Sequence, residues 1–94
     1  MKVNVLTKAS NELKIEIEGA GHTLCNLLQK KLLEEDGVEI AGYYVPHPLA
    51  SNPVFHIRTK GRVQPEAALK RAIRKAREMS EELKEEFDKA FKRT

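Results

Sequence analysis

The sequence lacks the features that several classes of protein require. One cysteine in 94 residues leaves no disulfide to form within the chain, which indicates a reducing compartment. The longest apolar runs are a few residues, whereas a transmembrane helix needs ~20. Met1-Lys2 leads into an alternating pattern and not into the apolar core of a secretory signal. We therefore expect a cytoplasmic protein, or a nuclear one in a eukaryote, with no membrane association.

Aromatic residues and strong charge are also scarce. Three phenylalanines, two tyrosines and no tryptophan offer few platforms on which nucleic-acid bases could stack. The net charge of +3 comes from 17 basic and 14 acidic residues, so the bias is mild. Such a charge permits contact with nucleic acid but does not require it.

The carboxylates do not form a catalytic pattern. Nucleotidyl transfer needs clustered aspartates that hold two Mg²⁺ ions, but Asp36 and Asp88 fall on different predicted elements. Gly19-Ala20-Gly21 precedes a helix, yet it lacks the third glycine of the dinucleotide fingerprint and the Gly-Lys-Ser/Thr of a P-loop. We expect no catalytic residue and no bound cofactor.

A metal site is also not expected. His22 and Cys25 are three residues apart and could both reach one ion from a single helical turn. A structural zinc site needs four ligands, and nothing in the sequence brings His47 and His56 to the same place.

Hydrophobic periodicity predicts six elements. Apolar and polar residues alternate near residues 3–7 and 13–17 and again in the segments 38–45 and 55–59, as they do in half-buried strands. One helix is expected between an N-cap at Thr23 and a stop at Asp36-Gly37, and another from Pro65 to Arg93. The order β-β-α-β-β-α predicts an α+β fold for residues 1–94, as a single domain: a four-stranded antiparallel sheet with both helices on one face.

The predicted helices carry more apolar surface than one sheet can cover. The segment Pro65 to Arg93 makes a helix of ~43 Å, whereas a strand of seven residues spans only ~23 Å. Ile73 lies early enough to cover the chain's own sheet, but the later apolar residues lie past the reach of a strand of seven residues. We expect these side chains to form an interface with another chain: Leu24, Leu27, Leu28, Leu32 and Leu33 of the first helix, and Met79, Leu83, Phe87 and Phe91 of the last.

The segment from Gly21 to Leu49 resembles a known family. Gly21-His22-Thr23-Leu24-Cys25-Asn26-Leu27-Leu28 opens a helix, and Tyr43-Tyr44-Val45-Pro46-His47-Pro48-Leu49 closes a strand. Their order and spacing are similar to those of the small alpha-like assembly subunits of archaeal DNA-dependent RNA polymerase, called subunit L, and of their eukaryotic counterparts. Cys25 departs from the smaller residue expected there, but a buried cysteine also behaves as a small hydrophobe.

The resemblance implies a non-catalytic role in transcription. The chain would heterodimerise through its helices with a larger alpha-like subunit, of the D type in archaea. The pair would be the platform on which the large catalytic subunits assemble. No specific DNA binding is implied. A loop would contact another subunit through Tyr43, Tyr44, Pro46, His47, Pro48 and Leu49.

Two alternatives remain open at this point. A stand-alone nucleic-acid-binding module would use the first half of the last helix together with Lys30, Lys31, Arg58, Lys60 and Arg62. Its binding to bulk DNA or RNA would depend strongly on salt. A homodimeric binding protein of the same layout would instead form a stable self-dimer.

Overall fold

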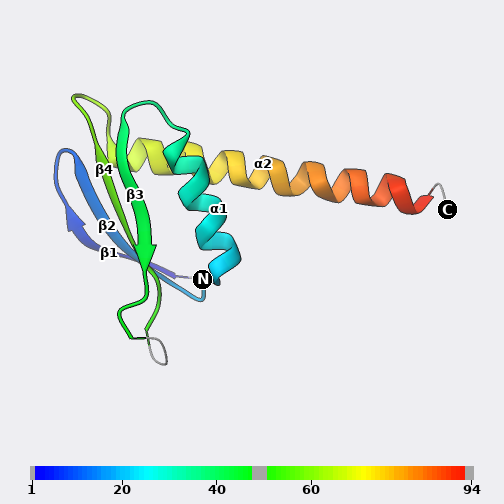
Figure 1. The fold of residues 1–94 in the computed structure, drawn as a ribbon, viewed down its shortest axis with the longest axis horizontal. Coiled ribbons are helices and arrows are strands. Elements are labelled where there is room, and N and C mark those ends of the chain that lie inside the picture. Colours follow the sequence, from blue (N-terminus) through cyan, green and yellow to red (C-terminus); the bar gives the residue numbers. More distant parts are fainter. Residues whose placement is uncertain (1, 48–50, 93–94) are drawn as a thin grey trace.

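Figure 1 shows the fold of the computed structural model, which describes residues 2–47 and 51–92. The predicted order of elements is confirmed, with small differences at the ends. The third strand stops one residue before the predicted Val45, and the predicted helix end at Arg93 lies outside the described residues. The elements are β1 (Lys2–Lys8), β2 (Glu12–Glu18), α1 (His22–Leu33), β3 (Val38–Tyr44), β4 (Val54–Thr59) and α2 (Pro65–Lys92).

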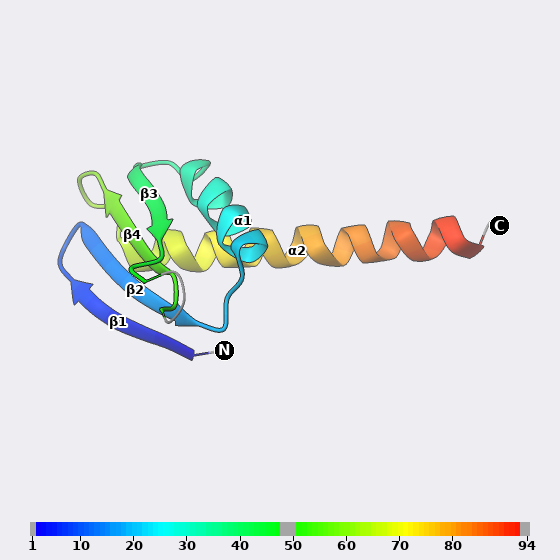
Figure 2. The same ribbon diagram turned by 60° about the horizontal axis from the view of Figure 1, so that its bottom comes forward.

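The four strands form one antiparallel sheet in the order β1-β2-β4-β3. Alternation places Leu13, Ile15 and Ile17 of β2 on the buried face, and their polar neighbours on the other. Both helices cover the same face, as predicted, and Figures 1 and 2 show α2 extending far beyond the sheet. In Figure 2 the edge strand β1 lies farthest from the helices. The helices therefore leave one side of the sheet poorly covered.

Helix α1 begins earlier than predicted. Its N-cap is Gly21, with φ −88° and ψ 170°, and no side chain caps the helix. The carbonyl of Gly21 already accepts the Cys25 N–H at 3.1 Å. Thr23 therefore lies inside the first turn, and its prediction as the N-cap is wrong.

Gly37 turns the chain from α1 into β3. Helix α1 ends at Leu33, ahead of the predicted stop, and Gly37 adopts a φ of +84°. A Cβ at this position would lie 2.4 Å from Cγ2 of Val63, so space as well as backbone conformation requires glycine.

Helix α2 contacts the rest of the chain through Pro65 and Leu69 near its start and through a row of alanines. Ala68 and Ala72 are fully buried, and Ala76 is nearly so. Ile73 is 47% exposed. Its prediction as a residue that covers the sheet is therefore wrong, because the alanines take that place. Small side chains let α2 approach the core closely, and they turn Ile73 toward the open side of the sheet.

One buried carboxylate joins the turn after α1 to α2. Glu35 is 7% exposed and accepts hydrogen bonds from Arg71 Nε, at 2.5 Å, and from Lys75 Nζ. The hydrogen bonds from Lys75 and then Arg71 lower the pKa of Glu35 below its usual value, against the opposing effect of burial. The two cations are about half exposed, so the cluster lies at the edge of the core.

This cluster predicts a pH-dependent stability. The pKa of Glu35 is lower in the folded chain than in the unfolded chain. Its contribution to the free energy of unfolding is therefore complete above the unfolded pKa of about 4.3 and is lost as the pH falls through the folded pKa. Glu35→Gln should lower the free energy of unfolding by about 1–3 kcal/mol at pH 7, and the difference should shrink toward pH 3. Urea denaturation followed by circular dichroism measures it, with Glu34→Gln as control. A difference that does not change with pH would contradict this role.

Candidate functional site

An apolar groove of about 500 Å³ opens between the helices and the side of the sheet that they leave uncovered. Its floor is the buried face of β2, and one wall comes from α1. The other wall is the first half of α2, while β1 contributes half-exposed valines at the open edge. The apolar lining residues are Val3, Val5, Leu13, Ile15, Ile17, Leu24, Leu27, Leu28, Leu69, Ile73 and Ala76.

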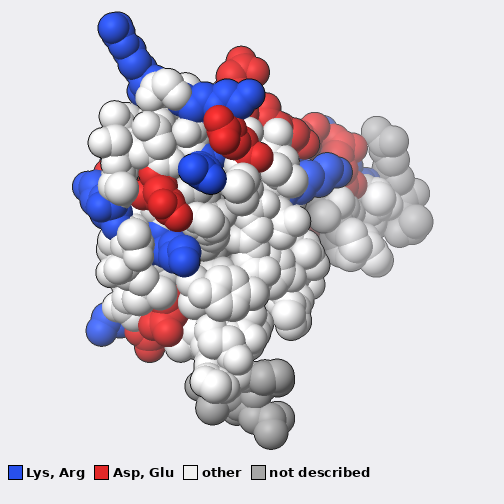
Figure 3. All heavy atoms as spheres, turned by 60° about the vertical axis from the view of Figure 1, so that its left-hand side comes forward, with Lys and Arg blue, Asp and Glu red and all other residues white. Residues whose placement is uncertain are grey.

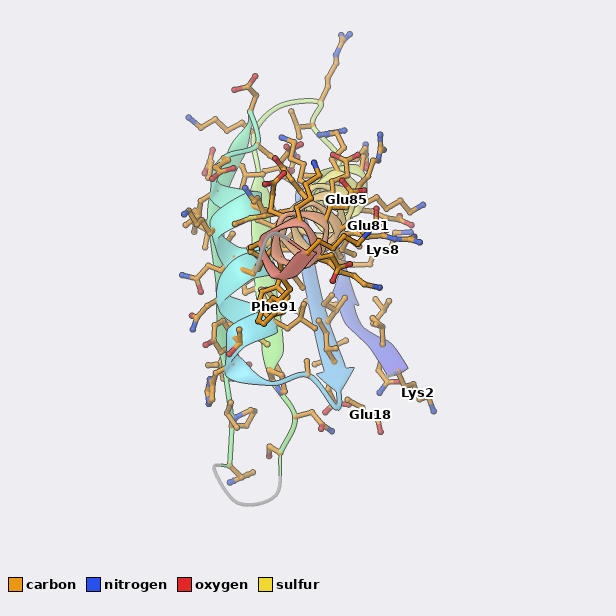
Figure 4. All side chains as sticks on the ribbon, turned by 90° about the vertical axis from the view of Figure 1, so that its right-hand side faces the viewer. Lys2, Lys8, Glu18, Glu81, Glu85 and Phe91 are labelled. Carbon is orange, nitrogen blue, oxygen red and sulfur yellow. The ribbon has the colours of Figure 1, made fainter. Side chains whose placement is uncertain are left out.

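The α2 wall of the groove continues as a stripe along residues 77–92. This segment follows the last buried residue, Ala76, and we call it the free half of α2. Every residue from 77 to 92 is exposed. At ~100° per residue, Leu83 and Phe87 lie on the same side of α2 as Leu69 and Ile73. The rings of Phe87 and Phe91 contact each other at a tilt of 43°, with centroids 4.6 Å apart. Figure 4 looks along α2 and shows Phe91 on a different side of the helix from Glu81 and Glu85.

We call the groove and this stripe together the apolar face. Outside the groove it comprises Met79, Leu83, Phe87 and Phe91, which are 47%, 70%, 60% and 66% exposed. An exposed apolar surface that runs continuously over two helices and a sheet edge is typical of a protein interface.

The structure brings together most, but not all, of the predicted interface residues. Leu24 and Leu27 are half-buried in the groove wall, and Leu28 contributes little exposed surface. Leu32 is fully buried in the chain's own core and has no surface for a partner, which corrects the prediction at this position. Leu33 is 53% exposed but does not line the groove.

Sequence reasoning missed the contribution of β1. The alternation predicted the strand, but not that Val3 and Val5 would remain 55% and 61% exposed. Leu6 is also exposed, next to an irregularity in the register between Val5 and Thr7. The composition of the strand carried a signal for this role, because an edge strand with three apolar residues is poorly suited to solvent.

The predicted contact loop begins at a polar cluster. The Tyr43 hydroxyl donates to Oδ1 of Asn26 at 3.1 Å and lies 3.1 Å from Nδ1 of His22. These contacts tie the end of β3 to the start of α1. Tyr44, Pro46 and His47 are exposed, whereas Pro48 and Leu49 lie outside the described residues. The role of this loop stays a prediction.

Within residues 2–47 and 51–92, no three His, Cys, Asp or Glu side chains lie where they could hold one metal ion. Cys25 is fully buried, and burial raises the pKa of its thiol. His56 Nε2 lies 2.7 Å from Oε1 of Glu12 on the neighbouring strand. In the same part of the chain, no helix is long and apolar enough to cross a membrane.

Acidic neighbours accompany several of the basic residues of the nucleic-acid hypothesis. Lys31 lies 3.4 Å from Glu34. Four basic residues in the first half of α2 form ion pairs: Lys70 with Glu66, Arg71 and Lys75 with Glu35, and Arg77 with Glu81. Figure 3 shows acidic and basic side chains interspersed on the visible face of the molecule. A charge pattern of this kind does not favour binding to phosphates.

The fold and its apolar face together define a dimerisation domain. Residues 12–86 match the family described as the RNA polymerase Rpb3/Rpb11 dimerisation domain, and the chain belongs to this family.

The similar proteins include archaeal RNA polymerase subunits. DNA-directed RNA polymerase subunit Rpo11 of Methanothrix thermoacetophila is 39% identical over 90 residues, which cover 96% of this chain and 98% of that protein. Rpo11 of Saccharolobus solfataricus is 42% identical over 80 residues, which cover 85% of this chain and 87% of the relative. The crystal structure of DNA-directed RNA polymerase subunit L from Thermoplasma acidophilum is 35% identical, with a TM-score of 0.83, and the match covers 98% and 90% of the two chains. The predicted family resemblance is confirmed.

Two adjacent residues of α2 test the division between core and apolar face. Ala72→Glu should cost about 3–5 kcal/mol, because it buries a charge in the chain's own core. Ile73→Glu should change stability by only about 1 kcal/mol, because its side chain faces the open groove. Urea denaturation of the two variants measures the difference. Equal losses would contradict this assignment of the helix faces.

Proposed function

We propose that this chain is the small, non-catalytic assembly subunit of a DNA-directed RNA polymerase of the archaeal type. It pairs through the apolar face with a larger alpha-like subunit of the D type. The pair is the platform on which the two large catalytic subunits assemble. The whole chain acts as one dimerisation domain in the archaeal cytoplasm.

The observation that carries this proposal is the free half of α2. Burying Met79, Leu83 and Phe87 would stabilise the helix by roughly 1.5–3 kcal/mol for each side chain. Most helices in proteins depend on packing of an amphipathic face, because short isolated helices are marginal in water. The stripe therefore favours a partner that covers it with a helix of its own.

The description of the family supports a protein partner. It names a dimerisation domain of RNA polymerase subunits, and the apolar face supplies a surface suited to that role. The groove offers a concave site beside a convex helix, so the partner has to present both a ridge that enters the groove and a helix that packs along the stripe.

The outer face of the sheet is largely polar, although Ile40 and Tyr44 of β3 are 42% and 51% exposed on it, and it suits later contacts in a larger assembly. Nδ2 of Asn4 donates to Glu16 at 2.9 Å and to Glu18 at 2.8 Å, and Glu12 contacts His56. These groups remain solvated without a partner, unlike the apolar face. This outer face and the segment after β3 are therefore left for the large catalytic subunits.

A charge in the stripe should prevent pairing without unfolding the chain. Phe87→Arg places a cation where the partner helix packs, and truncation of such a residue alone often costs a few kcal/mol of binding. Glu78→Arg, on the opposite side of α2, is the matched control. Size exclusion with light scattering should show a 1:1 complex with the larger alpha-like subunit for the parent and control, but not for Phe87→Arg. Equal binding by Phe87→Arg would overturn the interface, and a stable self-dimer of the parent would favour the homodimer.

Binding of the isolated chain to DNA should be weak and independent of sequence. Several of the basic residues form ion pairs with acidic neighbours, which should keep the affinity low. The affinity that remains comes from contacts with phosphates, so it should fall steeply between ~50 and 200 mM salt. Fluorescence anisotropy with two unrelated duplexes measures this. Tight, sequence-selective binding at ~150 mM salt would instead support the nucleic-acid hypothesis.

A further inference from the structure

Glu35 lies in a turn whose backbone is fixed on both sides. Its N–H donates to the Leu32 carbonyl at 3.1 Å, and its own carbonyl accepts the N–H of Val38 at 3.3 Å. Two residues later, the Gly37 carbonyl accepts the Lys60 N–H at 2.8 Å. The carboxylate therefore projects toward α2 from a rigid base between α1 and β3.

The cations that meet this carboxylate are one helical turn apart. Arg71 and Lys75 share a side of α2 roughly 120–160° around the axis from Leu69 and Phe87. The alanine row of Ala68, Ala72 and Ala76 lies between these two sides. The ion pairs thus hold one edge of the helix contact, and the apolar face begins at the other edge.

Pro65 and Leu69 are buried near the start of α2, but beyond Leu69 the buried residues are the alanines Ala72 and Ala76, and their packing alone does little to fix the rotation of the helix where it leaves the domain. Small side chains allow close approach, but they lack the knobs that interlock with a neighbouring surface. Glu35 supplies two charge-assisted hydrogen bonds with directional geometry at this contact. The last of them is at Lys75, next to Ala76, the last buried residue of the helix.

We propose that Glu35 is a positioning residue that fixes the rotation and direction in which the free half of α2 leaves the domain. Phe87 lies about 16 Å beyond Ala76 along the helix, so a tilt of about 10° at this point displaces it by about 3 Å. A displacement of this size would disrupt the close packing of side chains at an interface. The consequence that Glu35 thereby presents Leu83 and Phe87 to a partner rests on the proposed function.

The first test measures the direction of α2 in the free chain. Spin labels are attached at Arg58→Cys on the sheet and Glu85→Cys on the helix, in a Cys25→Ala background. Pulsed electron paramagnetic resonance should give a narrow distance distribution for this parent and for Glu34→Gln. Glu35→Gln should broaden or shift it while circular dichroism retains the helical signal. An unchanged distribution in folded Glu35→Gln would overturn the proposal.

Lys75→Gln provides a milder variant in case Glu35→Gln does not fold. It removes the contact nearest to the exit of the helix and keeps the one from Arg71. It should broaden the distribution less than Glu35→Gln does, and an unchanged distribution in folded Lys75→Gln would count against the proposal.

The second test measures dissociation of the larger alpha-like subunit. Glu35→Gln should weaken binding about tenfold in the parent but less than about twofold in a Phe87→Ala background, because the helix end then contributes little. Equal weakening in both backgrounds would show that Glu35 acts only through general stability. If the parent does not bind this subunit, the proposed function fails, whereas the spin-label result still decides the role of Glu35.

Discussion

The structure depends on a mismatch of length between α2 and the sheet beneath it. The helix has 28 residues and the strands have six or seven, so at 1.5 Å per residue about half of the helix has no sheet to cover. A core that includes only the first half of α2 is small, and small domains bury a modest share of their surface. The remaining apolar stripe stays exposed in the single chain, and under the proposed function the surface of a partner covers it.

The position of the groove follows from the same arrangement. Helix α1 packs over the side of the sheet that contains β3, and α2 crosses near β2 and β4 on its alanine row. Neither helix covers β1, whose Val3 and Val5 therefore stay exposed. The apolar face is thus one continuous surface that joins an edge strand, a groove and a helix. Under the proposed function, a partner that fills the groove also reaches the stripe, because both lie on the same side of α2.

The fold could be predicted from the sequence because the local signals agree with each other. Period-two alternation, the glycines at turns and Pro65 at the start of α2 each point to the same element order. Helical periodicity could not distinguish the neighbours Ala72 and Ile73, because both lie on the apolar side of the wheel and only the packed structure shows which faces the core. For the same reason the sequence predicted Leu32 at an interface, although this residue is buried in the chain's own core. The role of Glu35 could not be predicted from local sequence, since its partners are 36 and 40 residues away.

Under the proposed function, the chemistry of the two faces also orders assembly. Polar side chains on the outer sheet face hydrogen-bond with each other, as Asn4 does with Glu16 and Glu18, so this face depends less on a partner than the apolar face does. Burial of the apolar face, by contrast, lowers the free energy of the system. The contact that covers α2 therefore precedes those made by the polar face, and it completes the fold of the small subunit. Glu35 matters at this stage because a helix held at one angle loses less conformational freedom on binding than one that moves.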